Sequence, residues 1–328
     1  MEDAYTQRWH TPRINLDKPR YDQSTFSGRA KHFFQTTDPR NLLASEKQLD
    51  AAKELLALYR KGEENEKTTH DEVWRAKTLY DSAFHPETGE KMFILGRMSA
   101  QVPCNMTITG SMLTFYRHPA AILFWQWINQ SFNAIVNYTN SSGDLGKETK
   151  QLSKAYTAAT GAAMATALGV SYVAKRAPAV ISRMGPFAAV AAANCINIPL
   201  MRQKELDEGI IITDADGNEL GKSKKAARKA ISQVVISRIG MAAPAMMTTP
   251  LLMGFCQNLP LFKRFGARIE VPFQIGIVGL CLTFATPLCC AIFPQRSSLA
   301  VNKLESELQE KIKSQPNPPD RVYFNKGL

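Results

Sequence analysis

Six long runs without a charged residue constrain the fold of this chain more than any other feature. They cover residues 98–116, 119–143, 155–174, 184–201, 239–262 and 271–295. A helix needs roughly 20 predominantly apolar residues to cross the hydrocarbon core of a bilayer, and several of the runs reach that length. Soluble proteins rarely contain so many. We therefore predict an all-α fold class, with a polytopic helical membrane bundle over residues 97–295.

Within this membrane domain we expect about five transmembrane spans. The candidate spans are 98–116, 155–174, 184–201, 236–256 and 271–294. The stretch 208–222 is expected to be a loop that contains a β-hairpin, because a β-branched run precedes the turn-forming pair Asp216-Gly217.

Small residues recur in the span 155–174. Gly161, Ala165 and Gly169 follow one another at intervals of four residues and so share one helical face. This spacing lets two membrane helices approach closely, and we expect the ridge to lie against a neighbouring helix.

The run 119–143 differs from the others because it carries a stripe of amides. These are Gln126, Asn129, Gln130, Asn133 and Asn137, with aromatic and aliphatic residues on the opposite face. Such a helix suits either the membrane interface or the wall of a wet cavity. We interpret 119–138 as an interfacial or re-entrant helix. If it crosses the membrane instead, there are six spans and both termini lie on the same side.

Polar segments flank the membrane domain at both ends. Residues 1–13 are expected to be a flexible N-terminus, and residues 14–96 a helical soluble region that ends in the turn HPETGE. Two capping-box patterns, at 45–48 and 69–72, predict the starts of two helices in this region. Residues 296–328 are expected to form a short C-terminal helix and a tail.

The net charge of +11 belongs to the half of the chain that contains the apolar runs. Five basic residues between two of these runs stand out: Lys222, Lys224, Lys225, Arg228 and Lys229. Positive charge at such a place commonly meets anionic lipid, and a solvated helical face explains the cluster equally well. No nucleic-acid-binding signature accompanies it. The expected partner is therefore the lipid bilayer and not nucleic acid.

Polar side chains inside a bilayer are costly unless they are paired, so they mark candidate functional positions. The candidates for substrate binding are Asn105, Thr107 and Thr109 in the first span and Asn194, Asn197 and Pro199 in the third. We expect Asn194 and Asn197 to hydrogen-bond the substrate's amino or carboxylate group, and Pro199 to break the helix. The first-span residues would face them. The alternative for each residue is an interhelical hydrogen bond that only packs the bundle.

The chemistry of these candidates favours a transporter. Broken helices with polar groups near the bilayer midplane are typical of secondary transporters. None of the runs contains an Asp or Glu, so a zwitterionic amino acid suits them better than a charged solute. No HExxH or GxSxG motif is present, and the six cysteines lie in the apolar runs without CxxC spacing. We expect no enzyme activity, no cofactor and no metal.

Several motifs together resemble the sideroflexins. The resemblance extends from about Asp22 to Leu328 and rests on DQSTFSGRAKHFF, TDPRN, YDSAFHPETGEKM, GRMSAQVP, FWQWINQSFNAIVNYTN, PFAAVAAANCINIPLMRQ, VVISRI, TPLCCAIFPQ and VYFNKGL. Glu87 departs from the family's usual aspartate in the His-Pro turn.

The resemblance implies a multi-pass protein of the mitochondrial inner membrane with its N-terminal region in the matrix. It also implies import of serine for one-carbon metabolism, with alanine, glycine or cysteine as further substrates. The alternative function is a membrane scaffold or assembly factor in mitochondrial iron and haem handling, without transport. Because the N-terminus is a poor presequence, targeting would be encoded internally. The sequence identifies no protein partner.

Overall fold

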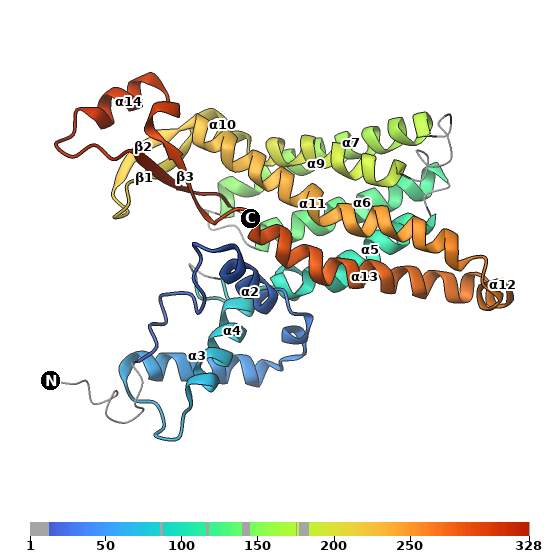
Figure 1. Cartoon of the computed structure of the whole chain (residues 1–328), viewed down its shortest axis with the longest axis horizontal. Helices are drawn as coiled ribbons and strands as arrows, with labels where there is room; N and C mark the ends of the chain where they lie inside the picture. The colour runs from blue at the N-terminus through green and yellow to red at the C-terminus, as the bar shows by residue number, and fades with distance from the viewer. Residues whose placement is uncertain are drawn as a thin grey trace.

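The computed structural model describes residues 13–85, 88–115, 118–139, 145–174, 176 and 184–327. The predicted flexible segment 1–13 lies outside these residues except for Arg13. The described chain forms an N-terminal helical region, a long helical bundle, and a small β-sheet unit (Figure 1).

The N-terminal region is helical, as predicted. It contains α2 (Phe26–Thr36), η1 (Pro39–Leu43), α3 (Glu46–Lys61), α4 (His70–Ala83), η2 (Ile94–Gly96) and η3 (Met98–Ala100). Both capping boxes are confirmed: Ser45 with Gln48 opens α3, and Thr69 with Glu72 opens α4. Helices α3 and α4 pack through a common apolar core that includes Leu56, Tyr59 and Val73. Local capping signals therefore place these helices correctly.

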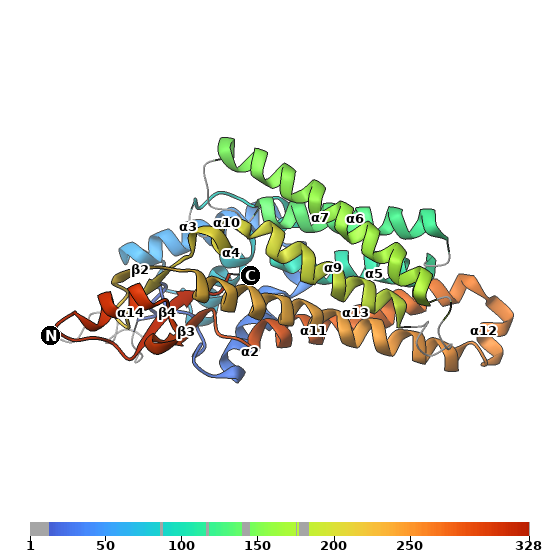
Figure 2. The same cartoon turned by 90° about the horizontal axis from the view of Figure 1, so that it is seen from above.

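In the part of the chain that the structure describes, six helices build the bundle. They are α5 (Gln101–Phe115), α6 (Pro119–Thr139), α7 (Leu145–Ala174), α9 (Gly185–Met201), α11 (Lys224–Cys256) and α13 (Ala267–Ala291). These helices lie side by side in both views (Figures 1 and 2). The short helices α10 (Gln203–Glu208) and α12 (Pro260–Phe265) lie in connections at opposite ends of the bundle.

Two bundle helices, over Lys224–Cys256 and Arg268–Ala291, are long and apolar enough to cross a membrane. Helix α9 is apolar but shorter, with 17 residues. The outer surfaces of the bundle expose large apolar side chains, among them Phe124, Tyr172, Phe255 and Leu280. Contiguous exposed apolar surface of this kind marks a face that is covered by another apolar medium or partner. The helical membrane domain is thus supported, and the number of five spans stays a prediction.

Helix α6 covers the segment 119–138, for which an interfacial or re-entrant position stays a prediction. It is one continuous helix of 21 residues that lies lengthwise beside α5 and α7. Its amide stripe faces inward, since Gln126 and Gln130 are buried. The alternative that the amide pattern left open, a helix that lines a cavity, describes α6 correctly.

The small-residue ridge of α7 is also placed differently from our expectation. Gly161 and Gly169 have open space where a Cβ would stand. Helix α7 instead packs through Ala163 and Ala167, which are buried, and Ala167 meets Ala189 of α9. The small residues of α7 do indicate close packing, but the packed face is that of Ala163 and Ala167 and not that of Gly161 and Gly169.

A four-stranded antiparallel sheet corrects the all-α fold class. Its strands are β1 (Ile210–Thr213), β2 (Glu219–Ser223), β3 (Arg296–Ala300) and β4 (Arg321–Asn325), in the order β2-β1-β4-β3. The predicted hairpin in 208–222 is β1 and β2. The predicted C-terminal short helix is α14 (Ser306–Lys313), but the expected tail contains β4, which pairs with β3 and β1.

The sheet has its own apolar core, and α11 belongs to both this core and the bundle. Ile212, Leu304, Ile312 and Val322 are fully buried, and Ala226 of α11 packs among them. Because α11 has 33 residues, it is roughly 50 Å long. It leaves the sheet and continues into the bundle, so the two parts share one rigid element.

Part of the basic cluster at 222–229 is used inside this unit. The Lys225 ammonium donates to the Leu304 carbonyl at 2.8 Å, and the Lys229 ammonium donates to the Ser298 carbonyl at 2.8 Å. Neither a lipid contact nor a purely solvated face describes these two lysines. They attach the C-terminal segment to the first turns of α11.

The N-terminal region is attached to the bundle at the last turn of α13. Arg29 of α2 is buried, and its Nε donates to the Ala291 carbonyl at 2.8 Å. Its Nη1 donates to the carbonyls of Gln23 and Ser24 at 3.0 and 2.8 Å. One guanidinium therefore joins the entry to α2 with the C-terminal end of α13, where a cation also complements the helix dipole.

Both non-membrane parts lie at the same end of the bundle, and α12 lies at the other end (Figure 1). If the bundle crosses a membrane in this arrangement, epitope tags at residue 66 and at the C-terminus will lie on the same side. A tag inserted at Gly266, next to α12, will lie on the opposite side. Protease digestion of sealed native vesicles checks this. Opposite accessibility of the residue-66 and C-terminal tags would establish an odd number of spans.

Arg29→Met should destabilise the protein because it keeps most of the side-chain volume but leaves four carbonyls, those of Gln23, Ser24, Ala291 and Ile292, without their donor. We expect a loss of roughly 1–3 kcal/mol, measured as a lower melting temperature in detergent. Arg40→Met is the matched control, since the Arg40 side chain is 84% exposed and, among the described residues, pairs only with the nearby Asp38. Equal melting temperatures for the two variants would contradict the anchoring role of Arg29.

Candidate functional site

A cavity of about 90 Å³ lies inside the bundle between α5, α6, α9, α11 and α13. Five amides line it: Gln101, Asn105, Asn129, Asn133 and Asn194. Two hydroxyls, Thr109 and Thr286, and one cation, Arg238, complete the polar lining. We call this cavity the central pocket. Its described lining residues include no carboxylate, but Arg238 departs from the uncharged lining that the sequence predicted.

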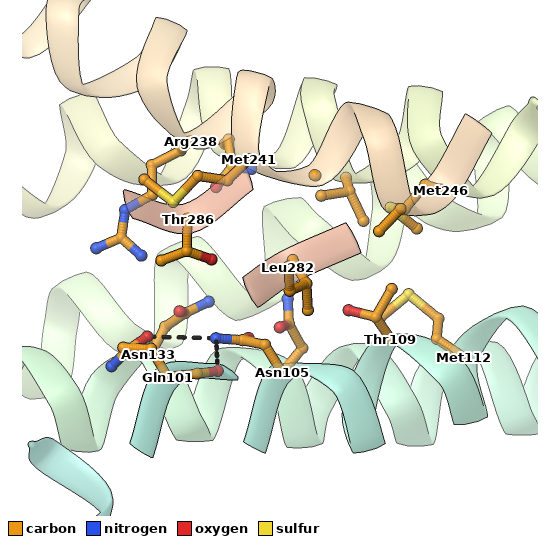
Figure 3. Close-up of a pocket in the computed structure, with 15 residues that line it drawn as sticks. Gln101, Asn105, Thr109, Met112, Asn133, Arg238, Met241, Met246, Leu282 and Thr286 are labelled. Carbon is orange, nitrogen blue, oxygen red and sulfur yellow. Dashed lines mark hydrogen bonds between the residues drawn. The ribbon is translucent and has the colours of Figure 1, made fainter. Parts of the chain in front are cut away.

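The central pocket has a polar end and an apolar end. Gln101, Asn133 and Arg238 lie toward one end, whereas Met112 and Met246 lie toward the other, with Thr109 near them (Figure 3). The polar end is the one nearer the N-terminal region, because α5 begins at Gln101 directly after η3. The site can therefore receive a small solute with one polar and one less polar part.

Three of the six predicted site residues line the central pocket. Asn105 and Thr109 come from α5, and Asn194 comes from α9. The two helices bring these side chains to one cavity, as we expected from the sequence.

The other three predicted residues lie elsewhere. Thr107 is on the exposed face of α5, and its hydroxyl donates to the Pro103 carbonyl of the preceding turn at 3.0 Å. Asn197 is buried, and its Nδ2 donates to Gln130 Oε1 of α6 at 2.6 Å. This is the interhelical packing bond that we kept as the alternative for each polar residue.

The predicted break at Pro199 is wrong. Helix α9 continues through Pro199 to Met201 and ends at Arg202. A proline inside a helix removes one backbone donor, but only two helical residues follow it here. The last turn can therefore continue without opening the helix beside Asn194.

Arg238 is the pocket residue that sequence reasoning missed. It lies inside the predicted span 236–256 but directly before the charge-free run 239–262. Charged residues mark the ends of the apolar runs, so the sequence places Arg238 at a boundary of a run. In the structure its side chain is half-buried and lines the central pocket. The described residues provide it with no hydrogen bond or ion pair.

Gln101 presents an unbonded donor to the same cavity. Asn105 Nδ2 donates to the backbone oxygen of Gln101 at 2.8 Å and to its Oε1 at 3.2 Å (Figure 3). The Gln101 side chain is only 7% exposed, and its Nε2 has no partner among the described residues. A buried amide donor without a partner is costly, which is the state expected of a group that bonds a solute.

A second cavity, of about 580 Å³, lies beyond the central pocket along the same helices. We call it the vestibule. Gln257, Glu270 and Gln274 are among its polar lining residues. It lies toward the α12 end of the bundle, where α11 ends and α13 begins.

Helices α5 and α13 pack closely beside the two cavities. A Cβ built on Gly110 of α5 would stand 2.7 Å from Ile275 Cγ1 of α13, and one on Gly279 of α13 would stand 2.7 Å from Met106 Sδ of α5. Gln274 Nε2 also donates to the Gly110 carbonyl at 3.1 Å. The close approach of the two helices at Gly110 therefore depends on glycine.

The Asn197–Gln130 bond makes a structural prediction that separates Asn197 from the pocket residues. Asn197→Ala and Gln130→Ala should each lower the melting temperature. In a double-mutant cycle they should couple by about 0.6 kcal/mol, the average for interhelical hydrogen bonds in membranes. Asn194→Ala serves as the comparison and should not couple to Gln130→Ala. Additive effects of Asn197→Ala and Gln130→Ala would contradict the bond.

Comparison with known proteins confirms the resemblance found in the sequence. The sequence model of the family described as Sideroflexins matches residues 15–328. The chain is 59% identical over 317 residues to Sideroflexin-1 of Ovis aries, covering 97% of this chain and 98% of the relative. It is 58% identical over 317 residues to Sideroflexin-1 of Homo sapiens, with the same coverage. For Sideroflexin-3 of Rattus norvegicus the identity is 58% over 315 residues, or 96% of this chain and 98% of the relative. No solved structure matches. The chain belongs to the sideroflexin family and is a membrane protein.

Proposed function

We propose that this protein carries small neutral amino acids, chiefly serine, across the mitochondrial inner membrane. The observation that carries the proposal is the central pocket, which lies within a bundle of apolar helices and is lined by amides and hydroxyls. Membership of the sideroflexin family supports a carrier-like role. Alanine, glycine and cysteine are the further substrates that we propose to test.

The size and lining of the central pocket support this choice of solute. Its volume of about 90 Å³ is several times the roughly 10–15 Å³ that a single water needs by the same measure. Such a space favours a small solute over an aromatic amino acid. Amides and hydroxyls can both donate and accept hydrogen bonds, so they can satisfy an amino group, a carboxylate and a side-chain hydroxyl.

The residues that we propose to contact the substrate are Asn105, Thr109 and Asn194. They come from two helices and line one cavity. We assign Asn197 a positioning role, because its bond to Gln130 holds α9 against α6. Thr107 and Pro199 carry no part of the proposal, since neither lines the central pocket.

We propose the matrix as the location of the N-terminal region. In the arrangement of Figure 1 the C-terminal sheet would then lie in the matrix too, because both parts lie at one end of the bundle. Imported serine would supply one-carbon metabolism.

Purified protein in liposomes should take up labelled serine faster than empty vesicles do. Asn194→Ala should lower uptake roughly 2- to 10-fold, the effect of one lost hydrogen bond of about 0.5–1.5 kcal/mol. Asn302→Ala, at an exposed asparagine of η4 (Val301–Lys303), is the matched control and should behave as the unchanged protein does.

Uptake equal to that of empty vesicles, from protein with an unchanged melting temperature, would overturn the transport proposal. It would favour the alternative of a scaffold or assembly factor in iron and haem handling. A panel of alanine, glycine, cysteine and phenylalanine defines the range, with phenylalanine expected to be excluded by size.

A further inference from the structure

Arg238 raises a question that the neutral lining of the central pocket does not answer. A guanidinium stays charged in proteins, and a charge among apolar helices is retained only with a partner or a functional reason. Of the elements that line the pocket, only α13 carries an acid, Glu270. That residue lines the vestibule instead. In the described parts of the chain, Arg238 therefore has no counter-ion.

We propose that Arg238 and Gln101 form a carboxylate subsite at the polar end of the central pocket. This inference rests on the proposed function and deepens it by assigning the orientation of the substrate. The planar guanidinium offers parallel N–H donors that match the two oxygens of a carboxylate. The unpartnered Gln101 Nε2 adds a neutral donor from the facing helix.

The two groups come from different helices and lie at one end of the pocket. Arg238 lies on α11 and Gln101 begins α5, and Figure 3 shows both toward the same side. Asn105 fixes the Gln101 amide by donating to its oxygen at 3.2 Å. The nitrogen of that amide is thereby left as the free end. The donors are thus held in place before the solute arrives, which lowers the cost of binding.

Two other cations lie at the C-terminal end of α13, and both are already bonded. Lys326 donates to the Phe293 carbonyl at 3.2 Å, and Arg29 donates to the Ala291 carbonyl. Both carbonyls belong to the last turn of α13 or the residues that follow it. Of these three cations, Arg238 is the one without a hydrogen-bonded oxygen among the described residues, so a carboxylate can approach it.

The subsite fixes the direction of the rest of the molecule. With its carboxylate at Arg238, an α-amino acid directs its side chain toward Thr109 and the apolar end formed by Met112 and Met246. A hydroxyl, a methyl group or a thiol is compatible with this end. The α-carboxylate is then required for recognition, whereas the identity of a small side chain is not.

The test is inhibition of labelled serine uptake by analogues that keep or lack the carboxylate. Alanine should compete with serine, whereas ethanolamine, which is serine without its carboxylate, should not. Arg238→Met should weaken apparent serine affinity roughly 10- to 100-fold, the range for a lost hydrogen bond to a charged group. The variant should also lose the preference for alanine over ethanolamine. Arg228→Met is the matched control, since it lies on the same helix with an exposed side chain.

Gln101→Glu keeps the size of the side chain and guards against a variant that merely fails to fold. The new carboxylate would occupy the guanidinium of Arg238 and repel that of the substrate. Unlabelled serine should then compete weakly with labelled serine, whereas competition by ethanolamine should become stronger. Equal competition by ethanolamine and alanine in the unchanged protein, or an unchanged preference in Arg238→Met, would overturn the subsite while serine uptake still supports the proposed function.

A binding measurement that does not depend on transport distinguishes failure of the proposed function from failure of the subsite. Serine, alanine, ethanolamine, chloride and phosphate are each added to the purified protein, and its melting temperature is measured. Stabilisation by the two amino acids that Arg238→Met abolishes supports the subsite even where uptake fails. Equal stabilisation by chloride or phosphate would show a general anion site, and the absence of any shift with the amino acids would reject the subsite.

Discussion

Polar side chains on apolar helices must meet a partner within the bundle, and this constraint organises the structure. The amides of α6 turn inward, where Gln130 accepts from Asn197 of α9. Gln274 of α13 donates to the carbonyl of Gly110 in α5. Each bond fixes which faces of two helices meet. An unpaired amide is costly in such surroundings, and three amides without such a bond among the described residues, Asn129, Asn133 and Asn194, line one cavity.

The same end of the bundle that holds the polar part of this cavity also anchors both non-membrane regions. Arg29 bonds the last turn of α13, and Lys326 bonds the carbonyl of Phe293 just beyond it. Thr286, on the pocket wall, lies less than two turns before Ala291. The N-terminal helices and the C-terminal strand are therefore coupled to the pocket through one helix.

The sequence predicts the features that depend on neighbouring residues, and it does not predict those that depend on contacts between distant segments. Capping residues at Ser45 and Thr69 and the Asp216-Gly217 turn act within a few residues, and the structure has the helices and the hairpin there. Strand β3 has only five residues and finds its partner in β4 beyond α14. No periodicity in so short a segment distinguishes it from a loop. The sequence does not identify Arg238 as a pocket residue for a related reason. Its role depends on the facing helices, which supply no acid.

The close packing of α5 and α13 beside the two cavities shows which contacts a movement of these helices would have to break. Gly110 of α5 lies against Ile275 of α13, and Gly279 of α13 lies against Met106 of α5. Separation of the two helices would also break the bonds of Gln274 to the Gly110 carbonyl and the Thr114 hydroxyl, which are 3.1 and 3.0 Å long. These contacts hold α13 near the vestibule, and the Arg29 bond to the Ala291 carbonyl holds its other end. Movement of α13 therefore costs contacts at both ends of the bundle.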